Sequence, residues 1–312
     1  MPSFFLFMAI LTAMTDRWID RFATYLRAER HYSEQTLEAY LPALEGCVSF
    51  FTPEGGTLDW GTLTPDDVRL WIAAQMEQRL SPLTINKRLS ALRSFYKFML
   101  MHGAVQADPT RLVCGPKKSK KLPSFVREKE MDKLFDHFTF PDDYFGRRDR
   151  LILLIFYSTG IRLSELVGLD INSINLHSST LKVLGKRNKE RIIPFGAELR
   201  EAISDYLLLR AEQPMAAHST ALFLGQRVPR ITKVAVGNIV RHTLGQITTL
   251  QRRSPHVLRH SFATAMLNNG AEIEVVRQLM GHQSIATTEI YTHTTFEQLK
   301  QAYRRAHPRS ED

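Results

Sequence analysis

A lysine-rich stretch bounded by prolines divides the chain and limits what it can fold into. Residues 115–124 begin with Gly-Pro and contain four lysines before Pro123. Proline and like charges keep such a segment extended, which favours a linker. A nuclear-localisation motif is the competing interpretation, but the lysines lie between two segments that look folded. The 312 residues suffice for two cores, so we expect domains at residues 14–114 and 125–312.

The first of these domains has the pattern of an all-helical fold. Thr64 and Ser81 each precede a proline, an arrangement typical of the start of a helix. Ser33 can cap another helix, and Gly103 is a stop signal. Apolar residues recur at helical spacing behind these starts. Four helices are therefore expected, beginning near residues 15, 33, 64 and 81.

The second domain is expected to be mostly helical with one small antiparallel sheet. Two runs of β-type composition, 179–184 and 191–195, flank the polar turn 185–190, and this predicts a hairpin. The expected helices lie near residues 146–158, 197–211, 232–248, 256–269, 272–280 and 295–306. The fold class is therefore mainly α, of the α+β kind.

The distribution of charge favours a polyanionic partner. The formal net charge is +9, and Asp and Glu are absent from residues 213–271 and from residues 78–107. A basic run is often only a solvated face, but two long acid-free runs favour the phosphate backbone of a nucleic acid as the partner. The candidate DNA contacts, in these runs, the linker and the hairpin turn, are Lys87, Arg88, Arg93, Lys117, Lys118, Lys120, Lys121, Arg187, Lys189, Arg241, Arg252 and Arg253.

The cysteines and the first residues bear on where the protein works. Cys47 and Cys114 have no metal-site spacing and make no disulfide framework, which fits a reducing, cytoplasmic environment. Residues 1–13 are apolar but too short to span a bilayer, and they lack a basic leader. We expect translation to start at Met14 and residues 1–13 to be artefactual or a loose tail; a signal anchor is the alternative. No other segment is expected to enter a membrane.

His256 and Arg259 form the first candidate site. They are three residues apart at the start of a helix after Pro255, so they share one face near the end where anions bind. This arrangement predicts contact with a phosphate. His256 and His260 also have metal-ligand spacing, but Arg259 between them would repel a divalent cation. We therefore expect no metal, and His260 turned toward the core or toward a carboxylate such as Glu165.

Arg162 and Tyr291 complete a set of side chains suited to phosphodiester chemistry. Arginines grip phosphate oxygens in bidentate fashion, and histidine moves protons near neutral pH. A tyrosine becomes a covalent phosphoryl carrier when its oxygen faces the phosphorus. Motifs for nucleoside triphosphates, GxxxxGK[ST] and GxGxxG, are absent from the sequence.

Four ordered motifs resemble those of the tyrosine recombinases, in particular the Xer-type enzymes and their integrase relatives. The motifs are Thr-Gly-Ile-Arg-Leu-Ser-Glu-Leu at 159–166, Gly-Lys-Arg-Asn-Lys-Glu-Arg at 185–191, His-Val-Leu-Arg-His-Ser-Phe-Ala-Thr at 256–264, and residues 279–293, which contain Gly-His and the tyrosine. The stretch 33–40 is similar to the family's helical DNA-clamp domain, a SAM-like core-binding fold. The resemblance covers nearly the whole chain.

The resemblance assigns a role to each matched residue. Arg162 and Arg259 would grip the scissile phosphate, and Tyr291 would be the nucleophile. The remaining assignments are His256 for proton handling, Lys186 for protonating the leaving 5′ oxygen, with Lys189 as the alternative, His282 for packing on the phosphate, and Glu165 with His260 for orienting these groups. Arg187, where relatives commonly have Gly, and Glu289, where they often have Gln, depart from the pattern without removing a catalytic group.

The family's chemistry implies a site-specific recombinase that cleaves and rejoins duplex DNA through a 3′-phosphotyrosyl bond, without ATP, metal or other cofactor. It implies resolution of chromosome or plasmid dimers at cell division, by a homo-tetramer on double-stranded DNA or by a hetero-tetramer with a paralogous recombinase. A DNA translocase is the implied activator. The alternatives are a mobile-element integrase, a type IB topoisomerase, a catalytically idle DNA-binding regulator and, least favoured, a metal-dependent nuclease. The segment 294–309 would pack on its own domain or on a neighbouring subunit.

Overall fold

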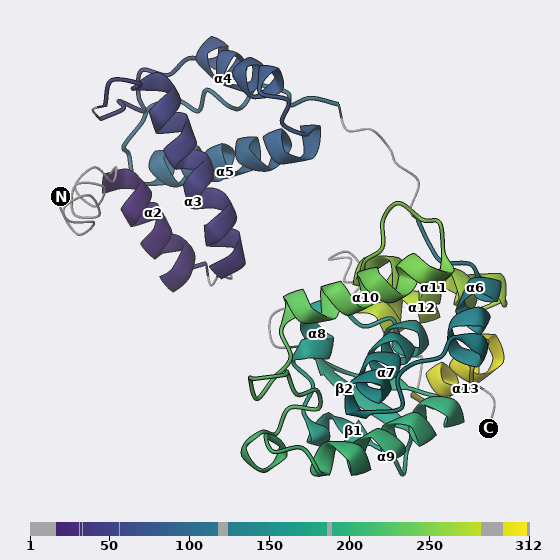
Figure 1. Ribbon diagram of the computed structural model, residues 1–312. Coiled ribbons are helices and arrows are strands. Elements are labelled where there is room, and N and C mark those ends of the chain that lie inside the picture. The colour runs from purple at the N-terminus through teal and green to yellow at the C-terminus, as the bar shows by residue number, and fades with distance from the viewer. Residues whose placement is uncertain are drawn as a thin grey trace. The chain divides into compact units, whose positions relative to one another are not determined.

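The computed structural model divides the chain into two compact units, Met1–Lys121 and Leu122–Asp312 (Figure 1). It describes residues 17–30, 32, 34–55, 57–117, 124–185, 189–281 and 296–310. Residues 1–13 and the linker lysines Lys118, Lys120 and Lys121 lie outside the described residues. Within the described ranges, every helix is too short or too polar to cross a bilayer.

The regular elements of the first unit are all helices in its described residues, and they begin close to the four predicted starts. Its helices are α2 (Arg17–Ala28), α3 (Glu34–Phe51), α4 (Pro65–Glu77) and α5 (Pro82–Met101). The Thr64 hydroxyl accepts from the Asp67 amide, and the Asp67 carboxylate accepts from the Thr64 amide, at 3.2 and 2.8 Å. Ser81 accepts from the Thr84 amide at 3.1 Å. These contacts confirm the caps at Thr64 and Ser81; Ser33 lies outside the described residues.

Aromatic rings pack among aliphatic side chains in the core of the first unit. The ring of Phe95 on α5 lies 5.3 Å from Phe22 on α2 and 4.8 Å from Trp60, centroid to centroid. The buried Tyr96 hydroxyl donates to the Trp60 carbonyl at 2.9 Å, so the loop before α4 is held on α5. All three tryptophans of the chain are in this unit, and tryptophan fluorescence therefore reports on its folding alone.

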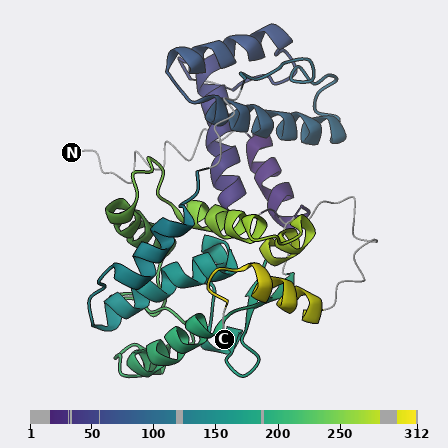
Figure 2. The same cartoon turned by 90° about the vertical axis from the view of Figure 1, so that its right-hand side faces the viewer.

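The second unit is built around α7 (Tyr144–Thr159), a helix that is buried almost all round from Leu151 to Thr159. Figures 1 and 2 both show α7 between α9 and α11, which explains why its sequence is apolar without a polar stripe. The other helices are α6 (Glu128–Asp132), α8 (Leu163–Val167), α9 (Ala197–Ala211), α10 (Lys233–Ile247), α11 (Pro255–Asn268), α12 (Ile273–Met280) and α13 (Phe296–Ala306), with a π-helical turn at Lys133–His137 and 3₁₀ turns at Ile171–Ser173 and Ala216–His218.

The predicted hairpin is confirmed and belongs to a three-stranded antiparallel sheet. The strands are β1 (Ile174–Asn175), β2 (Thr180–Leu184) and β3 (Glu190–Pro194), in the order β1-β2-β3. Val183 on β2 pairs with Arg191 on β3, and Leu181 pairs with Ile193. Because side chains alternate along a strand, Arg191 shares the inner face with the buried Ile193, whereas Ile192 between them is exposed. The fold is mainly α with a small sheet, as predicted.

The C-terminal helix α13 packs on its own unit, against α11 and β3. Leu299, Tyr303 and Ala306 are its buried face. Beyond the helix, the buried His307 ring shares a hydrogen bond of 3.1 Å with the Tyr157 carbonyl of α7. Arg309 then pairs with Glu198 at 2.9 Å and with Asp136 at 2.7 Å. The chain as described therefore fastens its C-terminal segment to its own core.

Candidate active site

The turn between α7 and α8 places the first predicted arginine. α7 ends at Gly160, whose φ of 60° is left-handed. A Cβ atom at this position would lie 2.3 Å from a ring carbon of Phe262, so only glycine fits. Two residues later Arg162 is the N-cap residue of α8, and its backbone amide donates to the Glu165 carboxylate at 2.7 Å. The predicted Thr-Gly-Ile-Arg-Leu-Ser-Glu segment is thus a tight turn that caps its own helix and fixes the backbone position of Arg162.

Glu165 is buried between two arginines. Its Oε1 accepts from Arg162 Nη1 at 2.9 Å and from Arg191 Nη1 at 2.7 Å, and its Oε2 accepts from Arg191 Nη2 at 2.8 Å. Only 2% of the Glu165 side chain is exposed. Burial alone would raise the pKa of this carboxyl, but the hydrogen bonds and positive charges of Arg191 and Arg162 outweigh it and lower the pKa to about 2. Glu165 is therefore an anion at every physiological pH.

Arg259 reaches the same place from α11. It is almost fully buried, at 6% exposure, and donates to the Gly160 carbonyl and, at 2.6 Å, to the Met280 carbonyl. Burial, and then the positive charge of Arg162, lower the pKa of the Arg259 guanidinium to about 10. The group still carries its charge at neutral pH. Two cations held this close in a poorly hydrated place favour an anion that touches both.

Three successive carbonyls at the end of α12 hold three arginines. The Leu279 carbonyl accepts from Arg191 Nε at 3.0 Å, the Met280 carbonyl accepts from Arg259, and the Gly281 carbonyl accepts from Arg162 Nη2 at 3.0 Å. The carbonyl end of a helix carries partial negative charge, so cations are favoured there. We call Arg162, Arg191 and Arg259 the arginine cluster.

Gly281, the residue that directly follows α12, has to be a glycine for the arginine cluster to form. Its φ of 64° is left-handed, and a Cβ atom there would lie 3.0 Å from the Arg191 guanidinium. A side chain at position 281 would thus be strained and would crowd Arg191. The chain leaves the arginine cluster at this glycine and continues into residues 282–295, which include His282 and Tyr291 and lie outside the described residues.

The structure brings together three of the predicted site residues, Arg162, Glu165 and Arg259. Lys186 and Arg187 on the hairpin turn lie, like Tyr291 and His282, outside the described residues. Arg191 was missed as a site residue, although it ends one of the recognised motifs. The feature that could have indicated its role is its position on β3, opposite a buried valine, because an arginine at such a place needs an anionic partner.

The two histidines of α11 differ from expectation in one respect. His256 is exposed near the start of the helix, three residues before the buried Arg259, and its contact with a phosphate stays a prediction. The expectation that His260 turns toward the core or Glu165 is wrong, because His260 is exposed and arginines occupy the Glu165 carboxylate. The described residues contain no group of three or more His, Cys, Asp or Glu side chains placed to hold a metal ion.

The predicted DNA contacts divide into exposed residues and residues with internal bonds. Lys87, Lys117, Lys189 and Arg252 are exposed. Arg93 and Arg241 are exposed too, yet each donates within its own unit, to the Val113 carbonyl at 2.6 Å and to the Asn238 side chain at 2.8 Å. The half-buried Arg88 and Arg253 donate to Gln75 and to the Leu250 carbonyl. Part of the charge in the acid-free runs therefore stabilises the fold.

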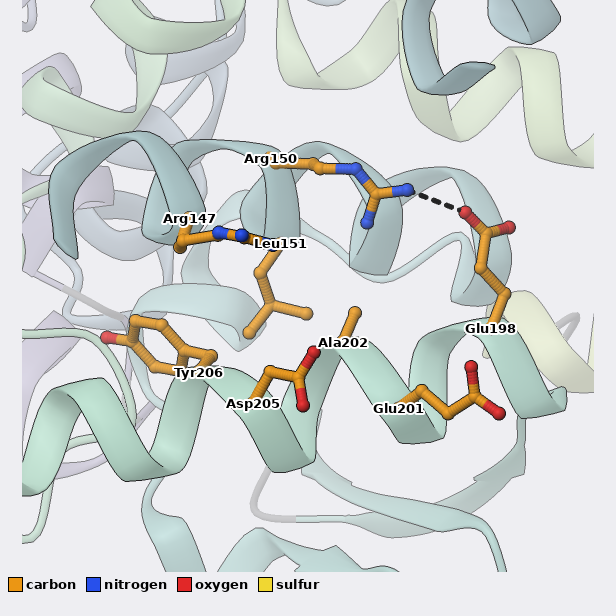
Figure 3. A pocket seen from close by; sticks show the side chains of 8 residues that line it. All are labelled: Arg147, Arg150, Leu151, Glu198, Glu201, Ala202, Asp205 and Tyr206. Carbon is orange, nitrogen blue, oxygen red and sulfur yellow. Dashed lines mark hydrogen bonds and ion pairs between the residues drawn. The ribbon is translucent and has the colours of Figure 1, made fainter. Parts of the chain in front are cut away.

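A separate cavity of about 340 Å³ lies between α7 and α9 (Figure 3). The Arg150–Glu198 ion pair, 2.9 Å long, crosses one end, and Asp205 and Tyr206 line the other. None of the predicted site residues lines this cavity. The arginine cluster, with its convergent positive charge, is the better candidate for chemistry on a phosphate.

The low pKa of Glu165 predicts a pH-dependent contribution to stability. The pKa falls from 4.5 to about 2 on folding, so the contribution is complete above pH 4.5 and is lost as the pH falls toward 2. It amounts to about 3 kcal/mol. We expect the gap in unfolding free energy between the native protein and Glu165→Gln to shrink by about 2 kcal/mol between pH 6 and pH 3.

The measurement is urea unfolding followed by far-UV circular dichroism, since the second unit has no tryptophan. Tryptophan fluorescence, which reports the first unit, serves as the internal control and should show no such gap. A gap that stays constant over this pH range would mean that Glu165 does not hold its arginines as ion pairs in solution.

Known proteins are similar to this chain in sequence. A profile of the phage integrase family matches residues 124–298, and one of the phage integrase N-terminal SAM-like domain matches residues 19–103. The chain is 37% identical to the tyrosine recombinase XerC of Pediococcus pentosaceus over 297 residues, covering 94% of this chain and 99% of the relative. It is 35% identical to XerC of Bacillus subtilis over 300 residues, covering 94% and 97%.

Solved structures show the same fold. The XerH site-specific recombinase bound to its difH substrate in a pre-cleavage complex aligns with a TM-score of 0.66 at 21% identity, over 92% of this chain and 83% of that one. The Tn1549 transposon integrase in complex with circular intermediate DNA aligns with a TM-score of 0.68 at 19% identity, over 92% and 99%. At these identities the likeness concerns the fold.

Proposed function

Because the chain belongs to the phage integrase family and is a tyrosine-type site-specific DNA recombinase, we propose that it cleaves and rejoins duplex DNA through a 3′-phosphotyrosyl intermediate formed on Tyr291. The observation that carries this proposal is the convergence of the Arg162 and Arg259 guanidiniums at the end of α12. The chain runs from that point directly into the segment that contains Tyr291.

The arginine cluster is suited to the charge that develops in such a reaction. Attack by a phenol oxygen on a phosphodiester gives a pentavalent transition state with added charge on the non-bridging oxygens. Arg162 and Arg259 would each donate to one of these oxygens in place of a backbone carbonyl. Because both guanidiniums are already oriented by protein groups, little reorganisation is needed when the transition state forms.

The other steps need proton transfer at two oxygens. We propose that His256 handles the proton of the Tyr291 hydroxyl, whose pKa in water is about 10. Lys186 would protonate the leaving 5′ oxygen, and His282 would pack against the phosphate. The 5′ hydroxyl of the same or another strand then attacks the phosphotyrosine and restores the phosphodiester, so that one bond replaces another and no ATP or metal is consumed.

Double-stranded DNA is the proposed partner. The XerH and Tn1549 proteins have been solved in complex with DNA, and this chain has a net charge of +9 with exposed Lys87, Lys117, Lys189 and Arg252. We propose that residues 14–114 clamp the duplex, that residues 115–124 form a flexible connection, and that residues 125–312 carry the chemistry. Phosphate contacts of this kind give affinity without base specificity.

The similarity to several proteins named XerC supports a housekeeping role. We propose that the protein acts in the cytoplasm as a tetramer on DNA, alone or with a paralogue, to resolve chromosome or plasmid dimers at cell division, and that a DNA translocase activates it. Deleting the gene should raise the fraction of cells that contain unseparated chromosomes.

The test of the chemistry is covalent trapping. A duplex with a nick close to the cleavage position loses its short 5′-hydroxyl fragment after attack, so the covalent complex accumulates. We expect an SDS-resistant protein–DNA adduct that forms equally in EDTA and that peptide mapping places on Tyr291. Cleavage that requires a divalent metal, or binding without any adduct, would instead identify a nuclease or a regulator.

A further inference from the structure

Arg191 joins three segments that the proposed chemistry needs. Its Nη1 and Nη2 bind the two oxygens of Glu165 at 2.7 and 2.8 Å, and its Nε binds the Leu279 carbonyl at 3.0 Å. It thereby links β3, the strand that follows the hairpin turn, to the start of α8 and to the end of α12. Its side chain is 15% exposed, so these bonds form away from bulk water.

We infer that Arg191 is a positioning residue that orients Arg162 through Glu165 for its grip on the phosphate. The inference rests on the proposed function, because it concerns the same phosphate. Arg191 turns every edge of its guanidinium toward the protein, whereas Arg162 keeps 34% of its side chain exposed. Arg162 is therefore the group that can meet DNA, and Arg191 is the group that holds it in place.

The geometry of Glu165 explains why a second arginine is needed. A carboxylate facing a single arginine is favoured to bind it through both oxygens. Here Arg191 forms that two-oxygen contact, and Arg162 binds Glu165 through Nη1 only. The other amino group of Arg162, Nη2, is left to donate to the Gly281 carbonyl. Without Arg191, Arg162 would be free to rotate into the two-oxygen contact and to withdraw Nη2.

Removing Arg191 would also weaken the positive charge at the phosphate. The three guanidiniums of the arginine cluster and the single carboxylate of Glu165 together carry two net positive charges. Removing Arg191 halves this excess and leaves the charge of Arg162 neutralised by Glu165. A phosphodiester that gains negative charge during attack would then meet a weaker field.

The experiment compares three variants in single-turnover cleavage of the nicked duplex. Arg191→Ala should cleave about 100-fold more slowly while its Kd for DNA stays within about threefold, since Arg191 makes no proposed phosphate contact. Arg191→Lys should cleave about tenfold faster than Arg191→Ala, because an ammonium restores the charge but not the forked contact.

Arg230→Ala is the matched control. Arg230 also fastens α8, by donating to the Val167 and Leu169 carbonyls at 2.8 and 2.9 Å and pairing with Asp170, but it does not bond Glu165 or Arg162. Its loss should lower the melting temperature as much as the loss of Arg191 while leaving the cleavage rate within about threefold of the native rate.

A pH profile separates positioning from stability. Glu165 is faced by Arg162 from α8, Arg191 from β3 and Arg259 from α11. Without Arg191 the buried carboxyl would take up a proton at a higher pH and release Arg162. That release would free Arg162 from the two-oxygen contact and from neutralisation by Glu165, so the ratio of the Arg191→Ala rate to the native rate should rise as the pH is lowered from 8 to 5, whereas the Arg230→Ala ratio should stay flat.

Three results would overturn the inference: native-rate cleavage by Arg191→Ala, equal rate losses in Arg191→Ala and Arg230→Ala, or a flat ratio for Arg191→Ala across pH. A native protein that forms no adduct would instead contradict the proposed function. In that case a crystal structure of Arg191→Ala still decides the positioning role. The Arg162 guanidinium should have left the Gly281 carbonyl, and an unchanged 3.0 Å contact would refute the role.

Discussion

Replacing Tyr291 with phenylalanine should abolish the covalent protein–DNA adduct, because no oxygen then remains to attack the phosphorus. The Kd for the duplex should stay within about twofold of the native value, since the phenol is a minor part of a largely electrostatic interface. The measurements are adduct formation on the nicked duplex, resolved in SDS, and a mobility-shift titration under native conditions.

The matched control for this variant is Tyr303→Phe. Tyr303 lies twelve residues beyond Tyr291 and is buried in α13, so its loss also removes one hydroxyl from the same region. The control should keep native cleavage. An adduct that persists in Tyr291→Phe, or one that disappears in both variants, would show that the nucleophile has been assigned to the wrong residue.

Replacing Arg259 with alanine should slow cleavage by about 1000-fold, because a charged donor to the transition state is lost. Arg259→Lys should recover only part of this loss, since lysine keeps the charge but not the forked geometry. The alanine variant should also lose about 2–4 kcal/mol of stability, because the Gly160 and Met280 carbonyls lose their buried donor. Single-turnover rates and urea unfolding measure the two effects.

Arg210→Ala separates the catalytic loss from the structural one. Arg210 is as buried as Arg259 and likewise donates to backbone carbonyls, those of Ser219, Ala221 and Leu222, but it lies outside the arginine cluster. It should lose comparable stability and keep its cleavage rate at temperatures well below its melting point. Equal rate losses in the two variants would mean that Arg259 serves only the fold.

Local signals predicted much of the fold because they act within a few residues. Thr64 and Ser81 cap their helices through bonds to residues three positions away, which is an interaction that the sequence displays directly. The hairpin followed from two β-type runs on either side of a polar turn. The five-residue helices α6 and α8 and the two-residue strand β1 were missed, since elements this short show no periodicity.

Prediction of the site was less complete, for a different reason. The motifs identified Arg162, Glu165 and Arg259, but they could not show that Glu165 binds two arginines rather than His260. The role of Arg191 depends on which face of β3 is buried, and neither face of Glu-Arg-Ile-Ile-Pro is clearly polar. The basic runs pointed to DNA, yet Arg88 and Arg253 donate to groups within their own units, because a guanidinium can satisfy a carbonyl as readily as a phosphate.

The sequence by itself determined the residue types that the chemistry requires, the helical starts and stops, and the division into two units, because each of these depends on composition or on neighbours along the chain. Only the tertiary structure decided which partner each charged group takes. A buried carboxylate binds whichever cations the folded backbone carries to it, and residues 162, 191, 259 and 279–281 meet only after α7, α11, α12 and the sheet have packed. The partners that the three guanidiniums of the arginine cluster bind are therefore a property of the packed core rather than of any one motif.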